Sequence, residues 1–126
     1  MVGFAVVGLG MGRGRARLIK ETAGADVKVV VDLNEELARE VAQELECDWT
    51  TQLDNALERE DVEVVMVMTP SGLHARLGVQ AARAGKHVIT TKPMDVTTAA
   101  CDELIGAADA AGVKLGVDYQ SRYVDN

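Results

Sequence analysis

The residues of this 126-residue chain with the clearest chemical pattern lie in its first 34 positions. An apolar run at 2–7 leads into a glycine-rich segment at 8–14, and a second apolar run ends at Asp32, twenty-four positions after Gly8. Closely spaced glycines let a backbone turn tightly and approach a pyrophosphate, and a carboxylate at that spacing can accept hydrogen bonds from ribose hydroxyls. The pattern therefore predicts a dinucleotide site in a strand–helix–strand unit.

The glycine segment departs from the usual G-x-G-x-x-G spacing. Gly8 and Gly10 fit the first two places, whereas Arg13 stands in the third and is flanked by Gly12 and Gly14. A glycine cluster alone also fits a flexible turn that ends a buried strand. The flanking strands, the helix and the later acid together favour the dinucleotide site over that alternative.

The acid also bears on the choice of cofactor. Asp32 would repel a 2′-phosphate, and the two residues after it supply no guanidinium to hold one. We therefore expect NAD rather than NADP. Arg13, Arg15 and Arg39 are the residues that could still reach a phosphate.

Alternating strands and helices should position these residues. The periodicity predicts strands at 2–7, 27–31, 47–50, 62–68, 86–90 and 113–117, of which the third is short and ambiguous. It predicts helices at 13–22, 35–45, 53–60, 73–84 and from 97 or 98 to 111. The expected helix caps and stops are Asp32 or Asn34, Ser71, Gly85, Thr97 or Thr98, and Gly112.

This alternation defines an α/β fold, a doubly wound parallel sheet of about six strands in three layers, with residues 1–126 as one dinucleotide-binding domain. The strands read as continuous apolar runs because both faces of such a sheet are covered by crossover helices. Ligands of such sheets lie beyond the carboxyl ends of the strands. Trp49, within the third strand, is expected to pack against a helix, and a place near the rim of the cofactor cleft is the alternative.

Composition and charge exclude several other classes of function. The formal net charge is −7 and no basic cluster occurs, which argues against nucleic-acid binding. No apolar run approaches the roughly 18 residues that span a bilayer. Cys47 and Cys101 lack the spacing of metal ligands or of a disulfide framework. We expect no metal site, no membrane segment and a reducing cytoplasm.

Five short segments follow one another in a specific order: AVVGLG at 5–10, VD at 31–32, MTPSGLH at 68–74, AGKHV at 84–88 and TKP at 91–93. Together they resemble the glucose–fructose oxidoreductase, inositol dehydrogenase and rhizopine-catabolism (Gfo/Idh/MocA) oxidoreductase family, over nearly the whole chain. The resemblance implies an amino-terminal Rossmann domain that binds NAD or NADP. It also implies a carboxy-terminal α/β domain that supplies much of the substrate pocket and the oligomer contacts.

The resemblance implies roles for residues of the later motifs. Thr69 and Pro70 would border the nicotinamide half of the cofactor. Lys92 would reach the substrate side as the catalytic residue, where its ammonium could stabilise alkoxide character as hydride leaves a carbinol carbon. Each of three residues also has an alternative role. Lys92 could be a solvated lysine, and His74 could pack or cap a helix. The bond before Pro93, often cis in the family, could be trans.

This sequence departs from the family pattern at three places. The glycine turn is one residue shorter than the common form, Arg15 stands where a histidine often follows, and Thr91 replaces a glutamate that touches the cofactor in relatives. The expected cofactor contacts are Gly8, Leu9, Gly10, Met11, Gly12, Arg13, Asp32, Thr69, Pro70, His74, Thr91, Lys92 and Pro93.

A segment at 119–123 resembles the handover to the second domain of the family, with Arg122 matching an arginine common there. The family's catalytic aspartate and histidine lie beyond it. We therefore expect the cofactor domain of a longer oxidoreductase that acts on a CH–OH group of a sugar, cyclitol or related polyol. The alternatives are a non-catalytic nucleotide-sensing or regulatory module and a protein-interaction domain. A surface left uncovered by the second domain would favour a homo-oligomer.

Overall fold

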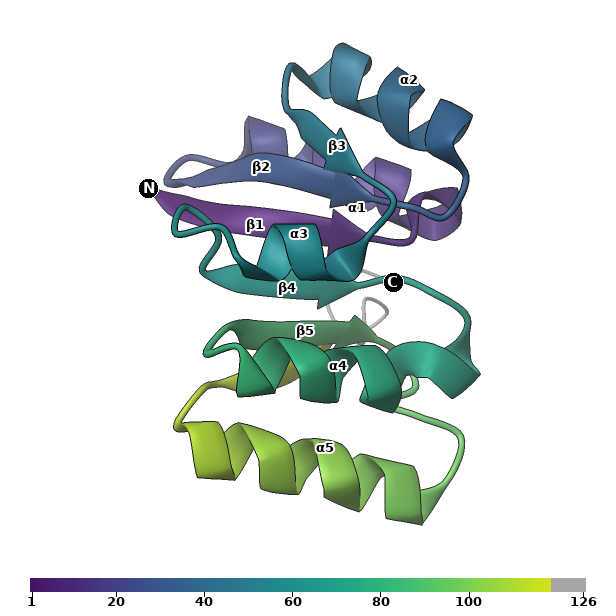
Figure 1. The fold of residues 1–126 in the computed structure, drawn as a ribbon, viewed down its shortest axis with the longest axis vertical. Helices are drawn as coiled ribbons and strands as arrows, with labels where there is room; N and C mark the ends of the chain where they lie inside the picture. Colours follow the sequence, from purple (N-terminus) through teal and green to yellow (C-terminus); the bar gives the residue numbers. More distant parts are fainter. Residues whose placement is uncertain (119–126) are drawn as a thin grey trace, which may run out of the picture.

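Six parallel strands form one sheet in the computed structural model, which describes residues 1–118 (Figure 1). The spatial order is β3-β2-β1-β4-β5-β6. The strands are β1 (Val2–Val7), β2 (Ala25–Val31), β3 (Asp48–Thr50), β4 (Val64–Val67), β5 (His87–Thr91) and β6 (Leu115–Asp118). The chain leaves β1 first toward β2 and later toward β4, so the order reverses beside β1. The handover segment at 119–123 lies outside the described residues.

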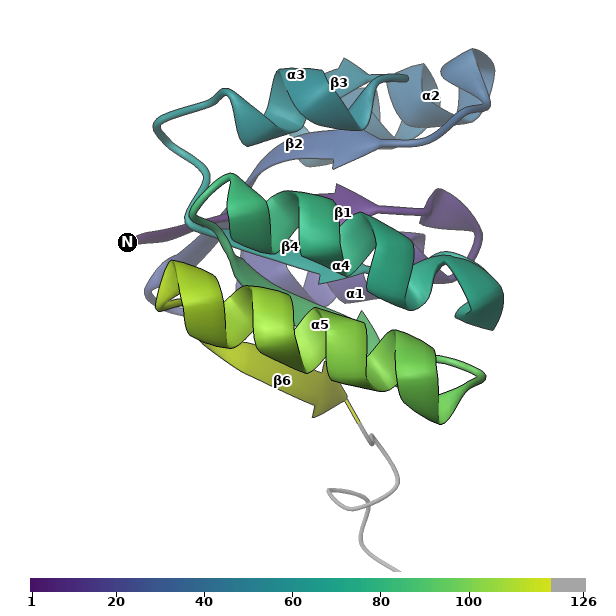
Figure 2. The same ribbon diagram turned by 60° about the horizontal axis from the view of Figure 1, so that its bottom comes forward.

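Helices cover both faces of this sheet (Figures 1 and 2). They are α1 (Leu9–Glu21), α2 (Glu35–Leu45), α3 (Leu53–Leu57), α4 (His74–Arg83) and α5 (Thr98–Ala111), with a 3₁₀ turn at Ser71–Leu73. One hydrophobic cluster packs α1 and α2 against the sheet, and a second packs α3 and α4 against its other face. The doubly wound three-layer fold predicted from the sequence is confirmed.

The two core clusters use alternate residues of the same strands. Val6 and Val30 belong to the cluster under α1 and α2, whereas Ala5 and Val29 belong to the opposite cluster. All four side chains are buried, at 0–2% exposure. Successive strand side chains point to opposite faces, so a continuous aliphatic run supplies both layers.

Several local expectations are confirmed at residue level. The helix at 35–45 has the predicted bounds, and the Asn34 side chain accepts a hydrogen bond from the backbone N–H of Leu37 at 3.1 Å. Thr97 caps α5 through the N–H of Ala100 at 3.1 Å. These caps satisfy backbone donors that a helix start leaves unpaired. Gly112 ends α5 in the left-handed conformation, with φ 69°.

Three predictions of helix bounds or caps are wrong. Helix α1 begins at Leu9 instead of 13, because Gly8, with φ 89°, completes the turn in one residue. The Ser71 side chain does not cap the fourth helix, since a 3₁₀ turn precedes α4 and the Asp95 carboxylate accepts from the N–H of Ala75 instead. Helix α3 ends at Leu57 instead of 60. Strand β1 has the predicted bounds, and the ends of the other strands differ from the prediction by no more than two residues.

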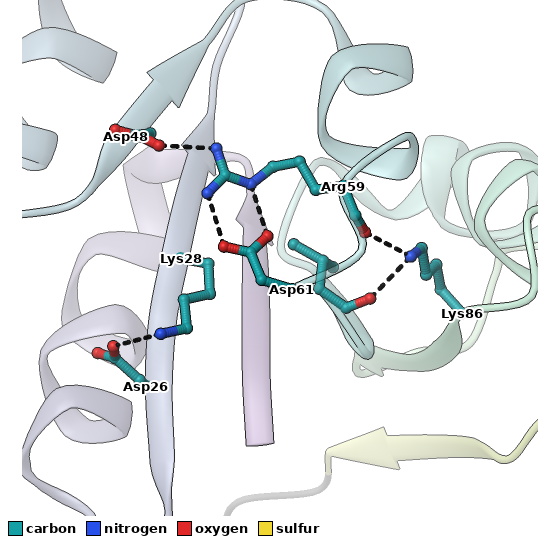
Figure 3. Close-up of polar contacts among 7 residues, drawn as sticks. Asp26, Lys28, Asp48, Arg59, Asp61 and Lys86 are labelled. Carbon is teal, nitrogen blue, oxygen red and sulfur yellow. Dashed lines mark hydrogen bonds and ion pairs between the residues drawn. The ribbon is translucent and has the colours of Figure 1, made fainter. Parts of the chain in front are cut away.

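Polar contacts hold the loops at the amino-terminal edge of the sheet, away from the predicted ligand side (Figure 3). Arg59 donates two hydrogen bonds to Asp61, at 2.8 and 2.9 Å, and a third to Asp48 at 2.7 Å. Lys86 donates to the backbone carbonyls of Arg59 and Val62 at 2.7 and 2.8 Å.

No helix in residues 1–118 is long and apolar enough to cross a membrane.

Candidate dinucleotide site

A cleft of about 550 Å³ opens at the carboxyl ends of β1, β2 and β4, where the strand order reverses. Open α/β sheets bind ligands at this place. The cleft is lined by Val7, Gly8, Gly10, Met11, Val31, Asp32, Leu33, Thr51, Leu53, Met68, Thr69, Pro70, Leu73 and Leu77. Of the predicted contacts, Gly8, Gly10, Met11, Asp32, Thr69 and Pro70 are therefore brought together.

The turn between β1 and α1 requires glycine at its first position. A Cβ atom on Gly8 would lie 2.9 Å from the backbone nitrogen of Thr69 and from the carbonyl carbon of Met68. Any side chain there would force the turn away from the end of β4 and would be strained at φ 89°. By contrast, a Cβ on Gly10 would meet no atom of residues 1–118 within 4 Å outside its own turn of helix. Gly10 therefore leaves open space above the first turn of α1.

The start of α1 presents backbone donors to this space. Two N–H groups of this turn are already used: that of Gly12 donates to the Gly8 carbonyl at 3.0 Å, and that of Leu9 donates to the Asp32 carboxylate at 2.8 Å. The N–H groups of Gly10 and Met11, which lie between them, have no acceptor within the helix, and both residues line the cleft. These two N–H groups and the helix dipole suit an anionic group such as a pyrophosphate.

Gly12 performs the packing that the third glycine of the usual motif performs. A Cβ on Gly12 would lie 2.9 Å from Cγ1 of Val6 and 3.3 Å from Cβ of Met68, so the missing side chain lets α1 approach the sheet closely. Arg13 is placed away from the cleft. Its guanidinium pairs with Glu44 of α2 at 3.2 Å and with Glu40 at 3.5 Å.

Asp32 is half-buried at the carboxyl end of β2 and holds two loops together. Its Oδ2 accepts from the N–H of Leu9 at 2.8 Å, and its Oδ1 accepts from the N–H of Asn34 at 2.8 Å. Each carboxylate oxygen has two lone pairs and uses one of them in these bonds, and Asp32 lines the cleft. The carboxylate can therefore accept a ligand hydroxyl without giving up its bonds to the protein.

Thr69 and Pro70 form the opposite wall of the cleft, immediately after β4. The Thr69 Oγ1 is buried and has no hydrogen-bond partner among residues 1–118. A buried hydroxyl without a partner costs free energy, so this atom is suited to a ligand group. Beyond it, Leu73 and Leu77 add apolar surface.

The residues of the lysine–proline motif stand at the end of β5 and do not line the cleft. Thr91 is buried, at 3% exposure, whereas the Lys92 and Pro93 side chains are exposed. The Lys92–Pro93 peptide bond is cis, as is often so in the family that the sequence resembles.

His74 is fully buried, and its ring nitrogens contact the backbone carbonyls of Thr69 and Pro93. It does not line the cleft, so the packing alternative describes its surroundings better than direct contact with a ligand. Asp95 was missed by the sequence analysis. The Asp95 carboxylate accepts a hydrogen bond from Ala75, which is 20 residues earlier in the sequence, and no local sequence pattern indicates such a contact.

The described residues contain no group of three or more His, Cys, Asp or Glu side chains that could hold a metal ion. The cleft, the open space at Gly10, the donors of α1 and the unpartnered Thr69 hydroxyl all fit a dinucleotide instead. The fold and the site thus define an NAD-binding Rossmann domain. The family model described as "Oxidoreductase family, NAD-binding Rossmann fold" (Gfo/Idh/MocA) matches residues 2–119, and the chain belongs to this family.

Individual relatives agree with this membership. The chain is 40% identical over 113 residues to a 2,7-anhydro-N-acetylneuraminate hydratase of Mediterraneibacter gnavus, and the match covers 89% of this chain and 30% of the relative. It is 35% identical over 99 residues to a scyllo-inositol 2-dehydrogenase (NADP⁺) of Bacillus subtilis, and this match covers 79% of this chain and 26% of the relative. The chain thus spans about a third or less of the length of these two relatives.

Solved structures show the same fold. The crystal structure of GenD2 from gentamicin A biosynthesis, in complex with NAD, superposes with a TM-score of 0.88 at 34% identity, over 92% of this chain and 34% of that one. The WlbA dehydrogenase of Bordetella pertussis, in complex with NADH and UDP-GlcNAcA, superposes with a TM-score of 0.90 at 27% identity, over 96% and 38%.

Proposed function

We propose that the cleft binds NAD in preference to NADP. The observation that carries this proposal is the Asp32 carboxylate, which lines the cleft beside the start of α1 and keeps lone pairs for the ribose hydroxyls. Its charge would repel a 2′-phosphate, and the adjacent Leu33, 91% exposed, offers no positive charge. Arg39 is engaged elsewhere, since its guanidinium lies 5.6 Å from the centre of the Trp49 ring.

In this proposal each part of the cleft holds one part of the cofactor. The N–H groups of Gly10 and Met11 bind the pyrophosphate. Thr69 and Pro70, on the far wall, border the nicotinamide half. When bound, NAD would supply a hydride acceptor. The apolar residues of the cleft exclude water from that group, which favours transfer over side reactions.

For the complete protein we propose hydride transfer between NAD and a CH–OH group of a sugar, cyclitol or related polyol. The relatives support this class by name, since one is a scyllo-inositol 2-dehydrogenase and another, from Acidithiobacillus ferrooxidans, is a UDP-N-acetylglucosamine 3-dehydrogenase. The named relatives are enzymes, and no observation favours the non-catalytic sensing module. The free thiols Cys47 and Cys101 suit the reducing cytoplasm that we propose as the compartment.

Lys92 is the residue that we propose as catalytic. Its exposed side chain follows β5, at the same edge of the sheet as the cleft. An ammonium group there can donate a hydrogen bond to the reacting oxygen and stabilise its alkoxide character as hydride leaves. In the complete protein, Lys92→Met should lower kcat by about 100-fold or more while NAD affinity stays near wild type. A Lys114→Met variant, which removes a lysine from the opposite edge, is the matched control.

The first experiment is calorimetric titration of the 126-residue chain with NADH and NADPH in parallel. Tighter binding of NADH supports the proposed cofactor and the role of Asp32. Equal binding of the two would refute the proposed preference while leaving the cleft as the site. Binding of neither would refute the proposal for this chain.

A further inference from the structure

His74 joins two loops that leave neighbouring strands of the sheet. Its side chain is 0% exposed at the first residue of α4. The Nε2 atom lies 2.6 Å from the carbonyl oxygen of Thr69, which follows β4. The Nδ1 atom lies 2.7 Å from the carbonyl oxygen of Pro93, which follows β5. One buried ring thus connects the wall of the cleft with the loop that carries Lys92.

The loop at 92–96 is held against α4 at a second point. The Asp95 carboxylate, 9% exposed, accepts from the N–H of Ala75 at 2.8 Å and from the N–H of Val96 at 2.6 Å. Ala75 follows His74 directly, so two successive residues of α4 bind this loop. Such paired contacts restrict how far the loop can shift along the helix end.

We propose that His74 is a positioning residue, which fixes the wall at Thr69 and Pro70 relative to Lys92 without touching the cofactor. The proposal rests on the proposed function, because it concerns the nicotinamide half of the same site. Carbonyl oxygens only accept hydrogen bonds, so each contact is a hydrogen bond when the ring nitrogen that faces the carbonyl carries the hydrogen, which depends on the tautomer. Loss of the ring would remove the contact to Thr69 and the contact to Pro93 together.

Substitutions at His74 can separate the two contacts. An asparagine amide places its nitrogen close to the position of Nδ1, and a glutamine amide places its nitrogen close to that of Nε2. His74→Asn should therefore keep the bond to Pro93, and His74→Gln the bond to Thr69. His74→Phe keeps a buried ring and neither bond. His87→Phe is the matched control, since His87 is the other histidine of the chain and lies at the amino-terminal end of β5, where its Nδ1 accepts from the N–H of Lys114 at 3.0 Å.

The test compares NADH with ADP-ribose, which lacks the nicotinamide, on the 126-residue chain. His74→Phe should weaken NADH binding about five- to tenfold relative to wild type while ADP-ribose binding changes less than about twofold. His74→Gln should restore more of the NADH affinity than His74→Asn, because it keeps the wall at Thr69. His87→Phe should leave the ratio of the two affinities unchanged. A merely structural role for His74 would weaken both ligands equally, and that result would overturn the inference.

Hydrogen exchange provides an independent measurement. Backbone amides at 69–71 and at 92–96 should both exchange faster in His74→Phe, whereas His74→Asn should protect the second segment and His74→Gln the first. Unchanged exchange in both segments of His74→Phe would overturn the inference. If His74→Phe does not fold, the two amide variants carry the same comparison. A wild-type chain that binds neither nucleotide would refute the proposed function, and the inference with it.

Discussion

The Asp32 carboxylate accepts a hydrogen bond from the backbone N–H of Leu9 at 2.8 Å, so the acid at the end of β2 also satisfies a donor at the start of α1. The same side chain therefore holds the glycine turn in place and lines the cleft. A loss of cofactor binding in an Asp32 variant consequently has two causes, a missing ligand contact and a displaced turn. Variants at this position must separate them.

Asp32→Asn separates charge from hydrogen bonding. The amide oxygen can still accept from Leu9, so we expect the melting temperature to fall by only a few degrees, as for a loss of about 1 kcal/mol. Without the negative charge, NADH affinity should fall about tenfold and the preference over NADPH should shrink. Calorimetry with both cofactors and a thermal scan measure these effects. Asp54→Asn removes an equal charge in the first turn of α3, outside the cleft, and should change neither affinity.

A parallel decrease in NADH and NADPH affinity in Asp32→Asn would contradict the proposed role. The carboxylate would then act only through the glycine turn. The change in preference between the two cofactors is therefore the quantity that matters.

Gly10→Val should separate folding from binding. A Cβ at this position meets no atom within 4 Å in the described part of the chain outside its own helix turn, so the variant should fold with a melting temperature near that of wild type. The added side chain would occupy the space above the first turn of α1, where we place the pyrophosphate, and NADH binding should fall by about 100-fold or more. Gly14→Val is the control, because it adds the same side chain to the same helix in open space away from the cleft. Retained NADH binding in Gly10→Val would exclude this site for the pyrophosphate.

Gly12→Ala tests the close approach of α1 to the sheet. Its Cβ would lie 2.9 Å from Cγ1 of Val6, so the helix must move outward, and we expect unfolding to become easier by about 1–3 kcal/mol. Gly14→Ala should instead stabilise the chain by about 0.5–1 kcal/mol, because alanine favours the helix and meets nothing within 4 Å. Denaturant unfolding of the two variants measures the difference. Equal stability would mean that Gly12 has no packing role.

Local sequence patterns were sufficient for much of the fold. The aliphatic runs of β1 and β2, the cap at Asn34 and the stop at Gly112 each depend on signals within a few residues, and the structure confirms them. The predicted start of α1 was wrong because a glycine-rich segment is typical of a loop. In the fold, Gly8 alone makes the turn and the following glycines are helical.

The contacts that organise the site could not be predicted in the same way. Asp95 caps α4 from 20 residues away, and His74 contacts carbonyls at separations of 5 and 19 residues. Backbone carbonyls have no sequence signature, so only the packing of β4 beside β5 brings these groups together. The motif residues were visible in the sequence, whereas the way they support one another was not.

The ion pairs between α1 and α2 should make stability depend on pH. The hydrogen bond from Arg17, with a smaller one from Arg13, lowers the pKa of Glu44 to about 2 from its usual value near 4.5. A carboxylate whose pKa is lower in the folded state adds stability that is complete above its unfolded value and is lost as pH falls toward the folded one. The Glu44 contribution should therefore be present above about pH 4.5 and vanish toward pH 2. Denaturant midpoints of wild type and Glu44→Gln, measured at low salt across this range, should converge as the pH falls. Glu36→Gln is the control, because it removes the same charge from the same helix at a residue for which no ion pair is found within residues 1–118. A midpoint difference for Glu44→Gln that stayed constant from pH 6 to pH 2 would show that the carboxylate does not titrate in this way.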